Sequence, residues 1–172
     1  PTSIAVLGVS AEEINFGRII LRNVLESGYP RSQVHIVKPG GGEIDGIGCA
    51  PSIAALPAPV DLLVIAAGAR QLPAIVDDAV TSGIVQSAIM IPGGVGETEG
   101  SAEIAAAVRE AVARGRRTPG GGPVFLGPNS LGAISRPGGY DTLFIPQSRL
   151  DKRWSAPGRR VALVSQSGAF IV

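Results

Sequence analysis

Short apolar runs alternate along this chain with stretches of helical periodicity, and this alternation restricts the fold more than any other feature. The runs consist mostly of Val, Ile, Leu and Ala without polar alternation, which is typical of strands buried on both faces. They cover residues 3–7, 33–37, 62–66, 87–91 and 124–126. Three amphipathic helical stretches lie between them, and we expect these helices to end at Gly28, Gly83 and Gly115. The pattern predicts an α/β fold with a doubly wound parallel sheet.

Length, charge and cysteine content exclude several classes of protein. The 172 residues, 45% of them hydrophobic, suit one domain plus a fragment. A net charge of +1 gives no overall field that favours nucleic acid. The longest apolar runs fall far short of the roughly 20 residues that span a bilayer, and no signal-peptide pattern opens the chain. One cysteine, Cys49, forms no internal disulfide. We expect a cytoplasmic protein without membrane or nucleic-acid partners.

The sequence predicts three segments. Residues 1–134 form the first domain, and residues 135–160 form an interdomain connector rich in Gly and Pro. Residues 161–172 begin a second, truncated α/β domain with a strand over Val161–Val164. This strand leads into Ser165, Ser167 and Gly168, whose small side chains expose the backbone N–H groups that bind phosphate at a helix start.

Ligands of such sheets bind where the strands end, so the loops after the strands carry the functional prediction. The first strand enters a long loop bracketed by Gly8 and Gly17, in the position of a nucleotide-phosphate loop. The dinucleotide fingerprint needs three glycines within six residues, and this loop lacks it. A phosphate loop and a purely structural turn remain equal alternatives.

The second strand ends at Lys38-Pro39, where NAD-binding sheets place Asp or Glu to accept from the ribose hydroxyls. A cation at this position attracts a phosphorylated ribose instead. Lys38 is therefore a candidate partner for the 3′-phosphate of coenzyme A (CoA) or the 2′-phosphate of NADP. A plain surface lysine is the alternative.

Small or turn-forming residues follow the remaining strands. They leave room for an adenine or a pantetheine arm, although ordinary turns before helices favour them equally. These candidates are Ala67 and Gly68, Pro92 and Gly93, and Asn129, whose amide can bind a ligand amide or local backbone. We expect Glu97 to cap a helix N-terminus, where a negative charge is favourable, and His35 to be a packed or edge-strand imidazole. We expect Cys49 to bind no metal because it has no partner ligand.

In their order and spacing, these loops resemble the CoA-binding domain of the NDP-forming acyl-CoA synthetases, whose relatives include the α subunit of succinyl-CoA synthetase. The resemblance spans nearly the whole chain. It rests on residues 4–10 (IAVLGVS), 50–62 (APSIAALPAPVDL), 94–97 (GVGE), 126–132 (LGPNSLG) and 161–169 (VALVSQSGA).

The resemblance implies a Rossmann-like CoA-binding domain followed by a flavodoxin-like synthetase domain. The family are acid–thiol ligases that interconvert acyl-CoA, NDP and phosphate with acid, CoA and NTP through an acyl phosphate and a phosphohistidine. Mg²⁺ and ADP/ATP or GDP/GTP belong to the full-length enzyme, with downstream synthetase domains or a separate β subunit. The implied CoA ligands are Ser10, Phe16 and Gly17 at the phosphates, Lys38 and Pro39 at the ribose phosphate, and Ala67, Gly68, Pro92 and Gly93 along the adenine and pantetheine. The Ser165–Gly168 turn would receive the phosphorylated histidine.

The chain departs from the family pattern at several positions. The family's phosphorylated histidine lies downstream of the residues present, and His35 belongs to the second strand. We therefore expect this chain alone to lack catalytic turnover. Ser130 stands where the family often has Cys, and Gly40–Gly42 replace an expected basic residue.

Two other functions remain as alternatives. The first is a non-catalytic CoA-sensing regulatory module, as found fused to protein acetyltransferases; the downstream histidine separates it from an enzyme. The second is an NADP-binding oxidoreductase or redox sensor, which rests on the same lysine and the same sheet. The acyl substrate and the oligomeric state, a homo-oligomer included, stay open.

Overall fold

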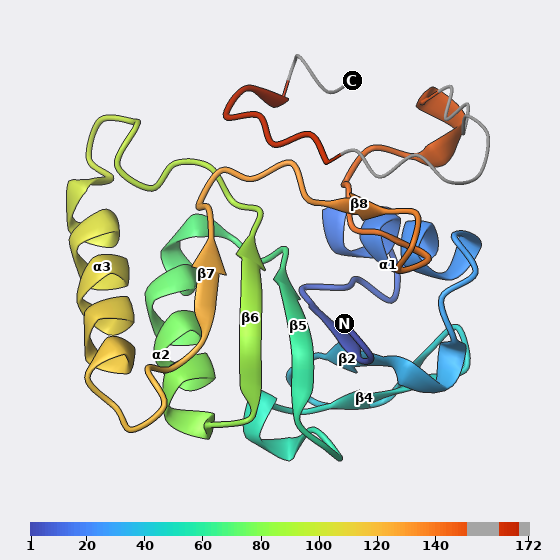
Figure 1. Cartoon of the computed structure of the whole chain (residues 1–172), viewed down its shortest axis with the longest axis horizontal. Helices are drawn as coiled ribbons and strands as arrows, with labels where there is room; N and C mark the ends of the chain where they lie inside the picture. Colours follow the sequence, from blue (N-terminus) through green and yellow to red (C-terminus); the bar gives the residue numbers. More distant parts are fainter. Residues whose placement is uncertain (151–161, 169–172) are drawn as a thin grey trace.

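The computed structural model describes residues 1–150 and 162–168 and contains a mostly parallel seven-stranded sheet (Figure 1). The strand order is β3-β4-β2-β1-β5-β6-β7, and only β3 runs antiparallel to its neighbour. The strands are β1 (Ile4–Leu7), β2 (Val34–Val37), β3 (Glu43–Ile44), β4 (Ile47–Ala50), β5 (Val60–Ile65), β6 (Val85–Met90) and β7 (Val124–Leu126). The expected parallel α/β sheet is confirmed.

Three helices cover the two faces of this sheet. They are α1 (Phe16–Glu26), α2 (Leu72–Ser82) and α3 (Ala102–Arg116), and four short 3-10 turns lie at Arg31–Gln33, Ile53–Ala55, Ala69–Gln71 and Gln147–Arg149. Apolar side chains of α2 and α3 pack with β5 and β6 in one core cluster. Ile20, Leu21 and Val24 of α1 pack on the other face with β1 and β2. Because both faces are covered, the central strands are apolar at nearly every position.

The helix ends match the sequence prediction except at α3. Gly83 ends α2 with φ +67°, as a left-handed cap that glycine adopts without strain. Gly115, expected to stop α3, lies inside the helix, which continues to Arg116. A Cβ on Gly115 would lie 2.9 Å from Cγ2 of Val80 in α2. This glycine therefore permits close contact between the two helices, and its interpretation as a stop is wrong.

The hairpin of β3 and β4 was not expected. Asp45 and Gly46 form its turn with φ +51° and +74°, and Ile44 pairs with Ile47. Strand β4 then pairs in parallel with β2, Ile36 opposite Cys49. The Asp-Gly dipeptide between apolar residues is a strong hairpin signal that the sequence analysis did not use.

The start of the expected connector is packed against the first domain. A second small sheet, β8 (Ile134–Ser135) and β9 (Tyr140–Asp141), lies beside α1 (Figure 1). Buried Asn23 of α1 donates through Nδ2 to the carbonyl oxygens of Leu143 (2.7 Å) and Ile145 (2.8 Å). These two hydrogen bonds and the buried Leu143 join the segment to the fold. Residues 151–160 of the expected connector lie outside the described part.

The strand expected over Val161–Val164 is wrong within the described residues. Residues 162–167 form neither helix nor strand, and Leu163 and Val164 are 71% and 94% exposed. A strand needs a neighbour to pair with, and no described strand lies beside this one. Val161 itself lies outside the described residues.

Candidate functional site

The loops after β1, β5, β6 and β7 meet at one edge of the sheet, where the arrowheads of β5 to β7 point in Figure 1. A Cβ on Gly8 would lie 2.7 Å from the carbonyl oxygen of Ala66 and 3.0 Å from the nitrogen of Ala67. At the other end, the backbone N–H of Asn129 donates to the carbonyl oxygen of Pro92 at 2.8 Å. The predicted residues after these four strands therefore lie at the same edge of the sheet.

Two glycines let the start of α1 sit directly on the sheet. Gly8 has φ +96°, and buried Gly17 lies so close to it that a Cβ on Gly17 would be 2.5 Å from the Gly8 carbonyl oxygen. Any side chain at Gly17 would force the helix away from β1. The two glycines therefore bring the first turn of α1 to the carboxyl edge of the sheet.

Asn15, which was not among the predicted site residues, closes the loop between β1 and α1. Its Oδ1 accepts from the amides of Arg18 (2.9 Å) and Ser10 (3.4 Å), while its Nδ2 donates to the Gly8 carbonyl oxygen (2.8 Å). The Ser10 hydroxyl accepts from the amide of Glu13 at 3.0 Å. An Asn directly before an amphipathic helix is an N-cap signal that would have found it.

The first turn of α1 presents donors suited to a phosphate. Among the described residues, no oxygen accepts from the amides of Phe16 or Gly17. Free amides at the start of an 11-residue helix, together with the helix dipole, favour an anion. Phe16 is 54% exposed, and its ring packs against Phe144 with 4.6 Å between the centroids. The loop thus fits the phosphates of a nucleotide cofactor.

Lys38 follows β2 and keeps its ammonium group uncommitted. Its backbone is fixed, because its amide donates to Ala50 (2.9 Å) and its carbonyl oxygen accepts from Gly41 (3.0 Å). The partly buried side chain makes no ion pair with the described residues, and Pro39 beside it is exposed. Val37 pairs with Leu7 of β1, so Lys38 and Gly8 leave neighbouring strands. A positive charge therefore stands next to the phosphate-fitting loop.

Gly93 lies between two polar side chains beyond β6. A Cβ on Gly93 would lie 3.0 Å from Oδ1 of Asn129 and 3.3 Å from Oε1 of Glu97. The Glu97 carboxylate accepts from the amides of Gly94 (2.6 Å) and Val95 (2.7 Å). Hydrogen bonds from its own amide and from Gly94 lower the pKa of Glu97. Glu97 thus closes its own loop, and its expected place at a helix N-terminus is wrong, since α3 begins only at Ala102.

The predicted phosphate-binding residues near the end of the described chain lie beyond the carboxyl edge. Ser165 donates through Oγ to the carbonyl oxygen of Ser167 (2.9 Å). A Cβ on Gly168 would lie 3.5 Å from Cδ2 of Leu131, two residues after Asn129. In Figure 1 this segment, drawn in red, passes above the strand ends.

Two shallow depressions of about 360 and 310 Å³ lie elsewhere, beside β2 and β4, and His35 lines both. Burial lowers the pKa of His35. In the described residues, no three His, Cys, Asp or Glu side chains are grouped to hold a metal ion. No helix of the described part is long and apolar enough to cross a membrane.

Known proteins are similar to this chain in sequence and in fold. A family model described as CoA binding domain matches residues 2–134. The chain is 34% identical over 173 residues to ADP-forming acetate–CoA ligase I of Archaeoglobus fulgidus, an alignment that covers 100% of this chain and 23% of the relative. It is 33% identical over 176 residues to the α subunit of ADP-forming acetate–CoA ligase I of Pyrococcus furiosus, covering 99% of this chain and 35% of that subunit.

A solved structure agrees with these matches. The dinucleotide-forming acetyl-coenzyme A synthetase 1 of Ca. Korarchaeum cryptofilum, in complex with phosphate and ADP, superposes with a TM-score of 0.74 at 29% identity. The superposition covers 86% of this chain and 30% of that one. The chain thus spans about a quarter to a third of the length of these relatives. The match over residues 2–134 shows that the chain belongs to the CoA-binding domain family found in ADP-forming acetate–CoA ligases.

Proposed function

We propose that this chain binds coenzyme A along the carboxyl edge of its sheet, as the CoA-binding part of a longer NDP-forming acyl-CoA synthetase. The observation that carries the proposal is that two groups without a partner among the described residues follow the neighbouring strands β1 and β2. The free amides of Phe16 and Gly17 suit the diphosphate of CoA, and the Lys38 ammonium suits its 3′-phosphate.

The remaining predicted residues line the path between the phosphates and the thiol. Ala67 and Gly68 after β5, and Pro92 and Gly93 after β6, would lie along the adenine and the pantetheine arm. The backbone N–H of Asn129 is held by Pro92 after β7, and its side-chain amide would bind an amide of the arm. Bound CoA would supply the thiol that receives the acyl group.

The rest of the synthesis would belong to the longer protein. His35 lies within β2 and is partly buried, so it offers no phosphate carrier at the site. Downstream domains or a separate β subunit would bring the catalytic histidine, Mg²⁺ and ADP/ATP or GDP/GTP, in the cytoplasm. Ser165, Ser167 and Gly168 would form the start of the phosphate-binding turn shared with that part.

The site can be tested by calorimetric titration of the chain with CoA, dephospho-CoA and NADPH. We expect CoA to bind, and loss of the 3′-phosphate or of the lysine in Lys38→Ala to weaken binding by about 1–3 kcal/mol. Arg109→Ala on the exposed side of α3 is the matched control, since it removes one positive charge far from the strand ends. NADPH binding without a response to CoA would instead support the oxidoreductase.

The CoA-sensing module differs from the synthetase in the longer protein. A synthetase would acquire an acid-labile phosphate on a histidine when incubated with NTP and Mg²⁺, and a sensing module would not. The redox-sensor alternative gains little from Cys49, because burial raises the pKa of its thiol and keeps it protonated.

A further inference from the structure

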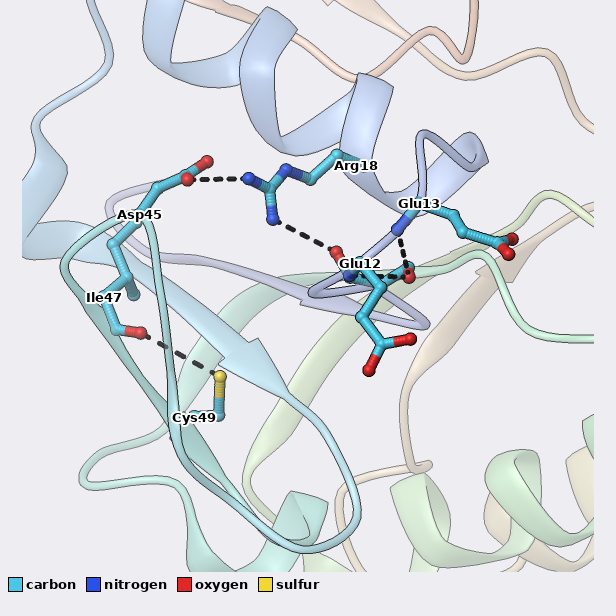
Figure 2. Close-up of polar contacts among 7 residues, drawn as sticks. Glu12, Glu13, Arg18, Asp45, Ile47 and Cys49 are labelled. Atoms are coloured by element: carbon cyan, nitrogen blue, oxygen red, sulfur yellow. Dashed lines mark hydrogen bonds and ion pairs between the residues drawn. The ribbon is translucent and has the colours of Figure 1, made fainter.

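Arg18, in the first turn of α1, bridges two loops that flank the proposed CoA site. Its Nη1 donates to the Ser10 carbonyl oxygen (3.1 Å), and its Nη2 donates to Oδ1 of Asp45 (2.7 Å). Figure 2 shows the contact between Arg18 and Asp45. The Arg18 side chain is 15% exposed and that of Asp45 38%. The guanidinium thus joins the β1–α1 loop to the turn of the β3–β4 hairpin.

Both ends of this bridge are fixed to loops that face the ligand. On one side, the Ser10 hydroxyl accepts hydrogen bonds from the backbone amides of Glu12 and Glu13, in the loop that ends at the free amides of α1. On the other side, hydrogen bonds tie the hairpin to the loop after β2. They run from the Lys38 amide to Ala50 and from the Cys49 amide to Gly42.

We propose that Arg18 and Asp45 are a positioning pair, which holds the diphosphate loop of residues 8–17 and the Lys38 loop in fixed relation so that both ends of CoA bind together. This inference rests on the proposed function. Two arms of the guanidinium are already engaged and Asp45 balances its charge. Arg18 therefore acts through the two loops rather than by contact with a phosphate.

The pair predicts a specific pattern of affinities. CoA carries both the diphosphate and the 3′-phosphate and needs both loops, whereas dephospho-CoA lacks the group that Lys38 would bind. We expect loss of the pair to weaken CoA about three- to tenfold, the effect of one or two hydrogen bonds, and to weaken dephospho-CoA less. A surface ion pair that only stabilised the fold would leave the ratio of the CoA affinity to the dephospho-CoA affinity unchanged.

Two variants remove the pair without disturbing the backbone. Asp45→Gly deletes the carboxylate at a position with φ +51°, which glycine adopts without strain. Arg18→Met removes the donors and keeps an apolar stem of similar length for packing. Asp77→Ala is the matched control, since it breaks another Arg–Asp pair of 2.7 Å, with Arg114, on the exposed surface of α2 and α3.

The experiment combines calorimetry with CoA and dephospho-CoA and hydrogen exchange of the ligand-free chain. We expect the Glu12 and Glu13 amides to exchange faster in Asp45→Gly and Arg18→Met than in the parent chain. In Asp77→Ala we expect neither the exchange rates nor the two affinities to change. An unchanged affinity ratio together with unchanged exchange would overturn the positioning role. If the parent chain bound no CoA, the proposed function would fail, and the exchange comparison alone would show whether the pair orders the loop.

Discussion

His35 shows how a single side chain responds to its place in the sheet. It is the only histidine in the chain and lies in β2, paired with Ala5 of β1. Burial disfavours its charged form and lowers its pKa below the usual 6.5. The unfolded chain therefore binds a proton at a pH where the folded chain does not.

The expected consequence is a loss of stability on mild acidification. Because the pKa of folded His35 is lowered, this contribution to stability declines as the pH falls below about 6.5 and levels off below the folded pKa. Because the chain has one histidine, a proton NMR titration of its imidazole ring gives the pKa of His35 in the folded chain directly. In His35→Gln, urea denaturation between pH 7 and pH 5.5 should show a smaller decline. An NMR pKa at or above 6.5 would contradict the prediction.

The contact between α2 and α3 depends on one missing side chain. Gly115 faces Val80, which is 9% exposed. We expect Gly115→Ala to destabilise the chain by about 1 kcal/mol, because an overpacking cost of about 1–3 kcal/mol exceeds the helix-propensity gain of about 1 kcal/mol. Denaturant unfolding measures the change. In the Val80→Ala background, where space is available, the same substitution should be neutral or stabilising, and equal effects in both backgrounds would exclude the contact.

At the scale of elements, the β3–β4 hairpin and the candidate site show what the local sequence can and cannot predict. The sequence predicted every parallel strand except β4, because a short apolar run can be recognised without knowing which strands lie beside it. Lys38, at the end of such a run, was accordingly placed correctly after β2. Arg18 was missed because its partner Asp45 lies 27 residues away and meets it only once the hairpin folds back.

In the whole molecule, one buried side-chain amide joins α1 to the segment that follows β9. Asn23 is 1% exposed and donates to two carbonyl oxygens about 120 residues away. Asn23→Asp keeps the shape but replaces the donor with a carboxylate facing those oxygens. We expect a loss of about 2–4 kcal/mol in unfolding free energy, measured in urea, and faster proteolysis within residues 134–149. Arg22→Ala, exposed on the same helix, serves as the control and should change neither. Unaltered proteolysis in Asn23→Asp would mean that other contacts hold this segment.

The sequence by itself determined five parallel strands, the three helices between them and the small residues at the strand ends, because burial on two faces imposes a periodicity that each segment carries locally. Only the tertiary structure decided what those segments meet. It placed Gly115 against Val80, turned the Glu97 carboxylate onto its own loop and joined the backbone of buried Leu143 to Asn23 of α1. These contacts depend on which surfaces come together in space. Neither the composition nor the spacing of residues along the chain specifies which distant residues will meet.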